Sequence, residues 1–211
     1  MRITKKIKDQ MLSILEEMYR DTKPALKFST PFELLIAVIL SAQCTDVRVN
    51  ITTGRLFSYA NTPEQILALG EAKLADEIKD CGLFRSKAKN IIATCAKLVS
   101  DYNSKVPADF SQLVALPGVG RKTANVVMSI AFDYPAIAVD THVFRVSNRL
   151  KLATGDTPLA VEQGLMKTIP RSKWSAAHHW LIWHGRKICK SRVPLCCECP
   201  LQSICPSNTA I

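Results

Sequence analysis

Two side chains suited to covalent and acid–base chemistry follow short breaks in the apolar pattern of this sequence. Lys122 comes directly after the turn sequence PGVG, and Asp140 precedes a new apolar-periodic segment. A neutral lysine amine is a nucleophile that can form a Schiff base, and a carboxylate can support developing positive charge or assist a proton transfer. The helix N-terminus expected at Lys122 disfavours its ammonium form and so makes the neutral amine easier to obtain.

The turn before Lys122 is also suited to holding a phosphate. Its glycines, Gly118 and Gly120, permit backbone angles that other residues resist. Apolar residues then recur at helical spacing, at Ala124, Val127, Met128 and Ala131. A helix that begins at Arg121 exposes N–H groups and a partial positive charge, which favour a phosphate without reading a base. An isolated PGxG sequence more often marks only a helix-turn-helix corner whose lysine is solvated, and this is the alternative interpretation.

Four of the eight cysteines lie close together near the end of the sequence. Their spacing is C-x6-C-x2-C-x5-C, formed by Cys189, Cys196, Cys199 and Cys205. In a reducing compartment such cysteines are more often free thiols or metal ligands than disulfides. Structural zinc usually takes two paired knuckles, whereas this segment has one close pair and two flanking cysteines, and iron–sulfur clusters also accept four thiolates. Cys197, beside Cys196, could complete the set in its place.

Composition favours a nucleic-acid partner. The 211 residues are 47% hydrophobic, enough for one large domain or two small ones, and their formal net charge is +10. That charge favours a polyanion, although basic surfaces also occur on proteins that bind none. No apolar run approaches the roughly twenty residues that span a bilayer, and the first residues do not form a signal peptide. We therefore expect an intracellular, cytoplasmic monomer with no membrane partner.

Helix signals run through the chain, and no segment alternates convincingly as a strand, so we expect an all-α fold. Periodicity alone does not decide between helix and strand for FELLIAVILSAQ. Thr45 or Asp46 can cap the helix after it, and Thr62 with Gln65 forms a capping box that opens a helix ended by Gly70.

A second hairpin is expected where CGLFRSKAKNII repeats the pattern of PGVGRKTANVV. It presents Leu83 at its tip. An apolar residue on a loop tip is more often a core plug, but in a protein that unstacks DNA it can insert between bases.

These motifs together resemble the helix-hairpin-helix DNA glycosylases, most closely the endonuclease III family. The resemblance covers nearly the whole chain and rests on SAQCTD, CGLF, LPGVGRKTA, VDTH, HHWLIWHGR and the terminal cysteines. It implies two lobes. One is a six-helix barrel over residues 23–134, with the helix-hairpin-helix motif at about 110–131. The other is a discontinuous domain of residues 1–22 and 135–211 that ends in a [4Fe–4S] loop at 189–205.

The resemblance also implies roles for individual residues. Lys122 attacks C1′ of a flipped nucleotide and leaves a Schiff base, and Asp140 stays an anion that supports the sugar. Gln43 enters the duplex and Leu83 is the wedge, while the hairpin residues Gly118, Val119, Gly120 and Arg121 bind DNA. The family spacing selects Cys196, with Cys189, Cys199 and Cys205, as ligands of one [4Fe–4S] cluster.

The activity so implied is that of a bifunctional DNA N-glycosylase and AP lyase of base excision repair. It removes oxidised or ring-saturated pyrimidines from damaged double-stranded DNA and cleaves the strand by β-elimination. No nucleotide cofactor or divalent metal is needed for the lyase step. Two alternatives remain. A mismatch adenine glycosylase shares the hairpin, aspartate and cluster but usually lacks the Schiff-base lysine, and a non-catalytic helix-hairpin-helix module would bind DNA with a structural metal.

Overall fold

The computed structural model describes residues 3–22 and 24–208, and within them all regular secondary structure is helical. The α-helices are α1 (Lys5–Tyr19), α2 (Pro31–Leu40), α3 (Asp46–Leu56), α4 (Pro63–Glu77), α5 (Phe84–Tyr102), α6 (Phe110–Val114), α7 (Arg121–Ala131), α8 (Thr141–Leu150), α9 (Pro158–Thr168) and α10 (Trp174–Lys187). Two short 3₁₀ helices are η1 (Arg171–Lys173) and η2 (Cys196–Glu198). The all-α prediction is confirmed. None of the described helices combines the length and apolar character that a bilayer crossing requires.

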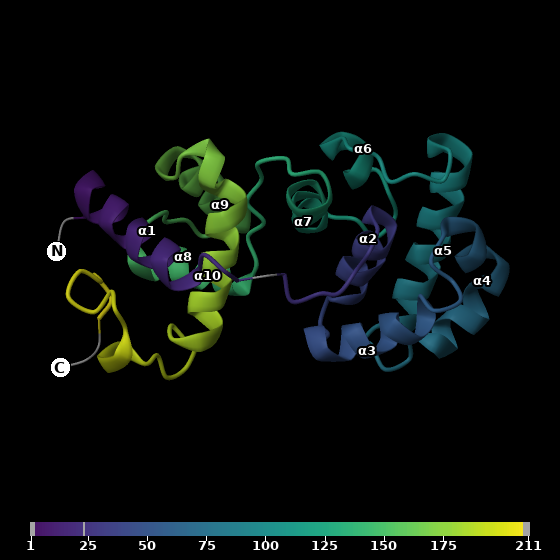
Figure 1. Cartoon of the computed structure of the whole chain (residues 1–211), viewed down its shortest axis with the longest axis horizontal. Coiled ribbons are helices and arrows are strands. Elements are labelled where there is room, and N and C mark those ends of the chain that lie inside the picture. Colours follow the sequence, from purple (N-terminus) through teal and green to yellow (C-terminus); the bar gives the residue numbers. More distant parts are fainter. Residues whose placement is uncertain (1–2, 23, 209–211) are drawn as a thin grey trace. The chain divides into compact units, whose positions relative to one another are not determined.

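The helices belong to two compact units (Figure 1). One unit is Pro24–Asp133 and contains α2 to α7, whereas the other joins α1 to α8, α9 and α10. Residue 23, where a domain boundary was expected, lies outside the described residues.

Helix α2 is the buried centre of the first unit. From Phe32 to Leu40 every residue is buried, and the helix contacts α3, α5 and α7. A helix that is apolar all round is covered on all sides, which is why its sequence shows no periodic face. Its buried acid, Glu33, is satisfied because its carboxylate accepts hydrogen bonds from the Ser29 N–H at 2.6 Å and the Asn61 side chain at 3.3 Å.

Side-chain caps mark the starts of α3 and α4 in this unit. Thr45 caps α3 by accepting from the Arg48 N–H, at 3.4 Å. At α4, the Thr62 hydroxyl accepts from the Gln65 N–H at 3.3 Å, and the Gln65 side chain accepts from the Thr62 N–H at 3.2 Å. The capping box predicted there is confirmed. The predicted break at Gly70 is also present, because its φ of 74° and ψ of 164° interrupt the helical path within α4.

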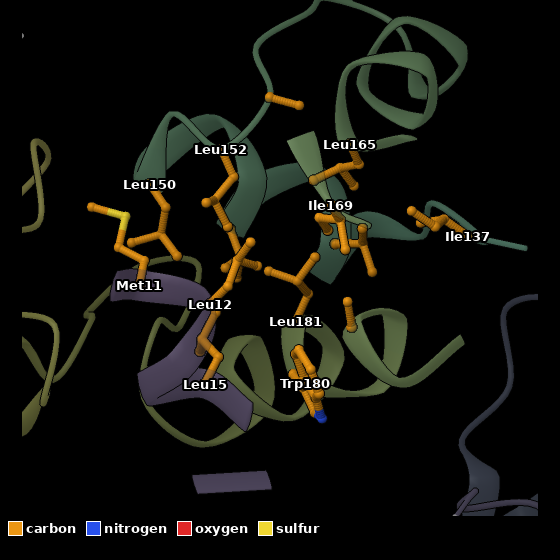
Figure 2. Close-up of a cluster of buried hydrophobic side chains, with 14 of the residues drawn as sticks. Met11, Leu12, Leu15, Ile137, Leu150, Leu152, Leu165, Ile169, Trp180 and Leu181 are labelled. Carbon is orange, nitrogen blue, oxygen red and sulfur yellow. The ribbon is translucent and has the colours of Figure 1, made fainter. Parts of the chain in front are cut away.

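The second unit is organised around a core to which α1 contributes one face (Figure 2). Met11 and Leu15 of α1 are fully buried, among apolar side chains that include Leu150 of α8, Leu165 of α9 and Leu181 of α10. The Lys8 ammonium donates to the Leu152 carbonyl at 2.8 Å. Helix α1 thus has the packing role that its apolar stripe predicts, and it joins both ends of the chain into one unit.

We predict that Leu15→Ala destabilises the second unit. Truncating a fully buried leucine removes apolar contacts and leaves a cavity, so the free energy of unfolding should fall by about 2–5 kcal/mol. Leu159→Ala is the control, because that side chain is 44% exposed. Urea unfolding followed by circular dichroism measures both variants. Equal unfolding midpoints for the two would contradict the assignment of Leu15 to the core.

Candidate functional site

The hairpin between α6 and α7 is shaped by a close approach to α5. Gly118 has φ +75°, and a Cβ built on it would lie 2.9 Å from the Asn90 Cβ, so both backbone angle and space require glycine. The Thr94 hydroxyl of α5 donates to the Pro117 carbonyl at 2.7 Å, and the Lys97 ammonium to the Ala115 carbonyl at 3.2 Å. The turn is therefore held rigidly from one side.

Val119 lies inside this hairpin. Its side chain is only 5% exposed, and its N–H donates to the Leu116 carbonyl at 3.1 Å. The predicted DNA-facing tip therefore consists of backbone at Gly118 and Gly120, both exposed, with Val119 as its anchor. Val119 is buried because removing an apolar side chain from water lowers the free energy of the folded protein.

Lys122 is exposed in the first turn of α7. Gly120 is the N-cap of this eleven-residue helix and has no side chain with which to cap it. The preceding residue, Arg121, places its guanidinium carbon 5.1 Å from the centroid of the Phe110 ring. The Lys122 amine therefore lies beside the N-terminus of α7, the positive end of the helix dipole, where the backbone is accessible to solvent.

Asp140 is the N-cap of α8 in the second unit. Its Oδ1 accepts from the Val143 N–H at 2.7 Å, and its carbonyl accepts from the Phe144 N–H at 2.8 Å. The side chain is half-buried and follows a buried segment outside the helices at residues 136–139. Capping uses one carboxylate oxygen and holds the group in a single orientation.

Gln43 and Leu83 lie on two turns that touch. Both residues are exposed, and both have left-handed backbone, with φ of 54° and 60°. A Cβ on Gly82 would lie 3.1 Å from the Gln43 carbonyl oxygen, so the turns are in direct contact. Leu83 is 58% exposed and is therefore no core plug. Left-handed backbone at two exposed non-glycine residues is uncommon and concentrates at functional sites.

Lys87 was not predicted from the sequence, yet it supports the Gln43 turn. It is 5% exposed, and its ammonium donates to the carbonyls of Leu40 and Ala42 at 2.8 and 2.7 Å. Burial lowers its pKa from the usual lysine value. The lysine lies at the start of α5, so it ties the end of α2 to the helix that carries Leu83. The only feature of the sequence that could have indicated this role is that Lys87 is a basic residue within the second hairpin pattern, CGLFRSKAKNII.

The four predicted ligand cysteines line one cavity of about 370 Å³ in the second unit. Cys197 is exposed and does not line it. Arg149 also lines the cavity, and its Nη1 lies 3.5 Å from the Cys189 sulfur and 2.7 Å from the Lys190 carbonyl oxygen. His184 places Nε2 3.8 Å from the Cys199 sulfur and Nδ1 3.3 Å from the Tyr19 hydroxyl. Burial lowers the pKa of His184 to about 4, so the ring is neutral at neutral pH.

The electrostatics of these cysteines favour a bound cation. Burial raises the pKa of Cys199 and of Cys205, and the neighbouring cysteines raise both further. Thiolates that repel one another in this way are stabilised by a positively charged group between them. Within residues 3–22 and 24–208, however, no three His, Cys, Asp or Glu side chains lie close enough to hold one ion.

This chain is similar to known proteins over nearly its whole length. Residues 36–171 match the HhH-GPD superfamily of base excision DNA repair proteins. Endonuclease III of Rickettsia conorii is 53% identical over 199 residues, which cover 94% of this chain and 95% of that protein. Endonuclease III of Escherichia coli (strain K12) is 50% identical over 196 residues, covering 93% of each. The chain belongs to the endonuclease III family.

A solved structure of the endonuclease III family has the same fold. It is a trapped endonuclease III–DNA covalent intermediate, with a TM-score of 0.94, 48% identity and coverage of 98% of both chains. The helix-hairpin-helix glycosylase fold predicted from the sequence is therefore confirmed.

We predict that the capping role of Asp140 can be measured apart from any chemistry. Asp140→Ala removes the acceptor of the Val143 N–H, so the free energy of unfolding should fall by about 0.5–2 kcal/mol. Asp140→Asn retains an oxygen acceptor and should remain close to the unaltered protein. Thermal unfolding compares the three proteins. If Asp140→Asn lost as much stability as Asp140→Ala, the charge and not the cap would be the stabilising feature.

Proposed function

We propose that this protein is a bifunctional DNA N-glycosylase and AP lyase of base excision repair. Its substrate is damaged double-stranded DNA that contains oxidised or ring-saturated pyrimidines. The observation that carries the proposal is the exposed Lys122 at the first turn of the hairpin helix, in a chain similar to the endonuclease III that was trapped covalently on DNA. These relatives favour this activity over the mismatch adenine glycosylase and over a non-catalytic module.

The hairpin binds DNA through its backbone. Gly118 and Gly120 are exposed at the N-terminal end of α7, where N–H groups and the helix dipole favour a phosphate. The formal charge of +10 adds sequence-independent attraction to the duplex. Contacts of this kind position the protein without reading bases, so damage is recognised when a nucleotide leaves the stack.

Gln43 and Leu83 hold the duplex open after extrusion. The exposed leucine inserts between bases as a wedge, and the glutamine occupies the space that the extruded nucleotide leaves. Extrusion costs a few kcal/mol and is easiest for a damaged base, which adds selectivity. Their two turns touch, and Lys87 braces the turn that carries Gln43, so both side chains are presented together.

The reaction is a nucleophilic substitution followed by an elimination. The neutral Lys122 amine attacks C1′ of the extruded nucleotide, and the base departs with the electron pair of the glycosidic bond. The sugar then opens to a Schiff base with Lys122, and β-elimination breaks the strand. The Asp140 carboxylate supports positive charge on the sugar and assists proton transfer from the amine. No divalent metal or nucleotide cofactor takes part.

The cysteine loop holds one [4Fe–4S] cluster through Cys189, Cys196, Cys199 and Cys205. The cavity, the four thiols and their shared electrostatics fit this group. When bound, the cluster would fix the shape of the loop. It would take no part in cleavage of the glycosidic bond. Arg149 supports the same loop by donating to the carbonyls of Lys190 and Ser191, at 2.7 and 2.9 Å. Lys187, Lys190 and Arg192 are exposed on or beside this loop and can contact phosphates.

We predict that Lys122→Gln abolishes borohydride trapping and strand cleavage but retains binding to damaged DNA, because glutamine keeps a similar length without the amine. Lys167→Gln is the charge-matched control, since Lys167 is an exposed lysine on α9. Trapping on DNA with an abasic site measures the difference directly. A trapped adduct at the unaltered rate in Lys122→Gln would show that another amine is the nucleophile.

Asp140→Asn should lower excision of a damaged base by roughly 10²- to 10⁴-fold, as expected for loss of a positioned acid–base group. On DNA whose base is already gone the defect should be smaller, because Schiff-base formation needs the amine more than it needs help with base departure. Single-turnover rates on the two substrates give this comparison. Equal defects on both would assign Asp140 to the lyase step alone.

We predict about four iron and about four sulfide per chain in protein purified without oxygen. Cys199→Ser should lower both contents, whereas Cys197→Ser should leave them unchanged because Cys197 is exposed and outside the cavity. Iron and sulfide analysis and the visible absorption spectrum are the measurements. About one zinc and no sulfide would overturn the cluster assignment and restore the zinc alternative.

A further inference from the structure

The turns that present Gln43 and Leu83 also bring two thiols together. Cys44 directly follows Gln43, and Cys81 lies two positions before Leu83. Their turns touch, because a Cβ built on Gly82 would lie 3.1 Å from the Gln43 carbonyl oxygen. Burial raises the pKa of the Cys81 thiol, and the nearby Cys44 side chain raises it further. Cys81 also donates to the Thr52 hydroxyl, with sulfur and oxygen 3.7 Å apart. These thiols lie in the first unit, which does not contain the cluster cysteines.

The two thiols differ in access to solvent. Cys81 is fully buried, whereas Cys44 is partly exposed. An oxidant from solution therefore meets Cys44 before Cys81. Cys95 offers a comparison within the same unit, because burial raises its pKa to about 12 and leaves little of the reactive thiolate.

Lys87 places a cation beside the pair. Its ammonium interacts electrostatically with both thiols and is held by two carbonyl groups at the end of α2. Burial raises the pKa of Cys81, and the positive charge of Lys87 opposes that rise. A neighbouring cation of this kind favours thiolate, which is the form that attacks an oxidant or another sulfur.

We propose that Cys44 and Cys81 are a modification site at which a hydroperoxide forms a reversible disulfide between the two turns. The site takes a peroxide as its substrate class and a dithiol as its reductant.

The proposed oxidation has two balanced steps. The Cys44 thiolate attacks one peroxide oxygen, the O–O bond breaks, and the other oxygen leaves as an alcohol or water after taking a proton; Cys44 is then a sulfenic acid. The Cys81 sulfur attacks the Cys44 sulfur, and hydroxide leaves and becomes water with the proton from the Cys81 thiol. The two cysteines have lost two electrons and two protons in total. A dithiol reverses the reaction by exchange.

The places of Cys44 and Cys81 in the chain tie this bond to the position of both turns. Cys44 lies between the end of α2 and the start of α3, and Cys81 lies between α4 and α5, so neither is within a helix. A disulfide requires sulfur atoms about 2.05 Å apart, much closer than two thiols that are not bonded. The turns already touch at Gly82 and the Gln43 carbonyl. Closing the bond therefore displaces Gln43 and Leu83, and on the proposed function it weakens binding to damaged DNA.

Peptide mapping tests the disulfide itself. The full-length protein with its metal content intact is treated with hydrogen peroxide, its free thiols are alkylated under denaturing conditions, and the unreduced digest is analysed by mass spectrometry. We expect a peptide pair linked through Cys44 and Cys81 that disappears after dithiothreitol, with Cys95 recovered as an alkylated thiol. Recovery of Cys44 and Cys81 as alkylated thiols, as irreversible acids, or in pairs with other cysteines would overturn the proposal.

Binding to a duplex with a reduced abasic site tests the consequence. Oxidation should weaken binding by about fivefold or more, the lower end of typical coupling between sites, and dithiothreitol should restore it. Cys44→Ala should show no reversible change, whereas Cys95→Ala should respond like the unaltered protein. Peroxide damage to the cluster loop would appear in Cys44→Ala as well and would not be reversed by dithiothreitol.

An unchanged affinity despite a mapped Cys44–Cys81 bond would refute the effect on the two turns. A different result would show that the proposed glycosylase and lyase activity is absent. The reduced protein would then form no borohydride-trapped adduct, while the disulfide would still be mapped.

Discussion

The burial of α2 is the constraint on which the positions of the candidate DNA-facing residues in its unit depend. The helix is covered on all sides and contacts α5, whose start carries Leu83, and α7, whose start carries Lys122. Its own end leads into the turn with Gln43. Lys87 then satisfies two carbonyls at that end, where the last C=O groups of a helix lack partners within it. One close-packed helix thereby positions the three side chains that we propose as nucleophile, wedge and space-filling residue.

Several residues in this protein combine a structural task with the chemical one proposed for them. Asp140 caps α8 and so is held in one orientation, which is also what a group that stabilises a transition state requires. Gly118 allows the close approach to Asn90 and leaves the hairpin backbone exposed. Arg149 braces the cysteine loop through carbonyl groups and lies beside the Cys189 sulfur. Substitutions at such positions affect stability and function together, so matched variants such as Asp140→Asn are needed to separate them.

Six of the eight cysteines form two groups with different surroundings. The four cysteines of the loop surround a cavity large enough for a cofactor, and their pKa values rise through burial and mutual repulsion. Cys44 and Cys81 instead lie on two turns that touch, and a buried ammonium is their neighbour. The first arrangement suits ligation of a positively charged group, and the second suits bond formation between the sulfurs.

The sequence by itself determined the helical class, the capping box of Thr62 and Gln65, the break at Gly70 and the hairpin before Lys122. It left Thr45 and Asp46 as alternative caps, and the structure shows that Thr45 is the N-cap. These features depend on residues a few positions apart, so local propensity and hydrogen bonding suffice to specify them. Only the tertiary structure decided that Leu83 is exposed while Val119 is buried, because the same kind of apolar tip can plug a core or face solvent.

The tertiary structure likewise placed Cys196 and not Cys197 at the cavity, made Lys87 a brace for α2, and brought Cys44 to Cys81. Each of these outcomes depends on partners far away in the sequence, whose approach is set by close packing of the helices and is not encoded in any local pattern.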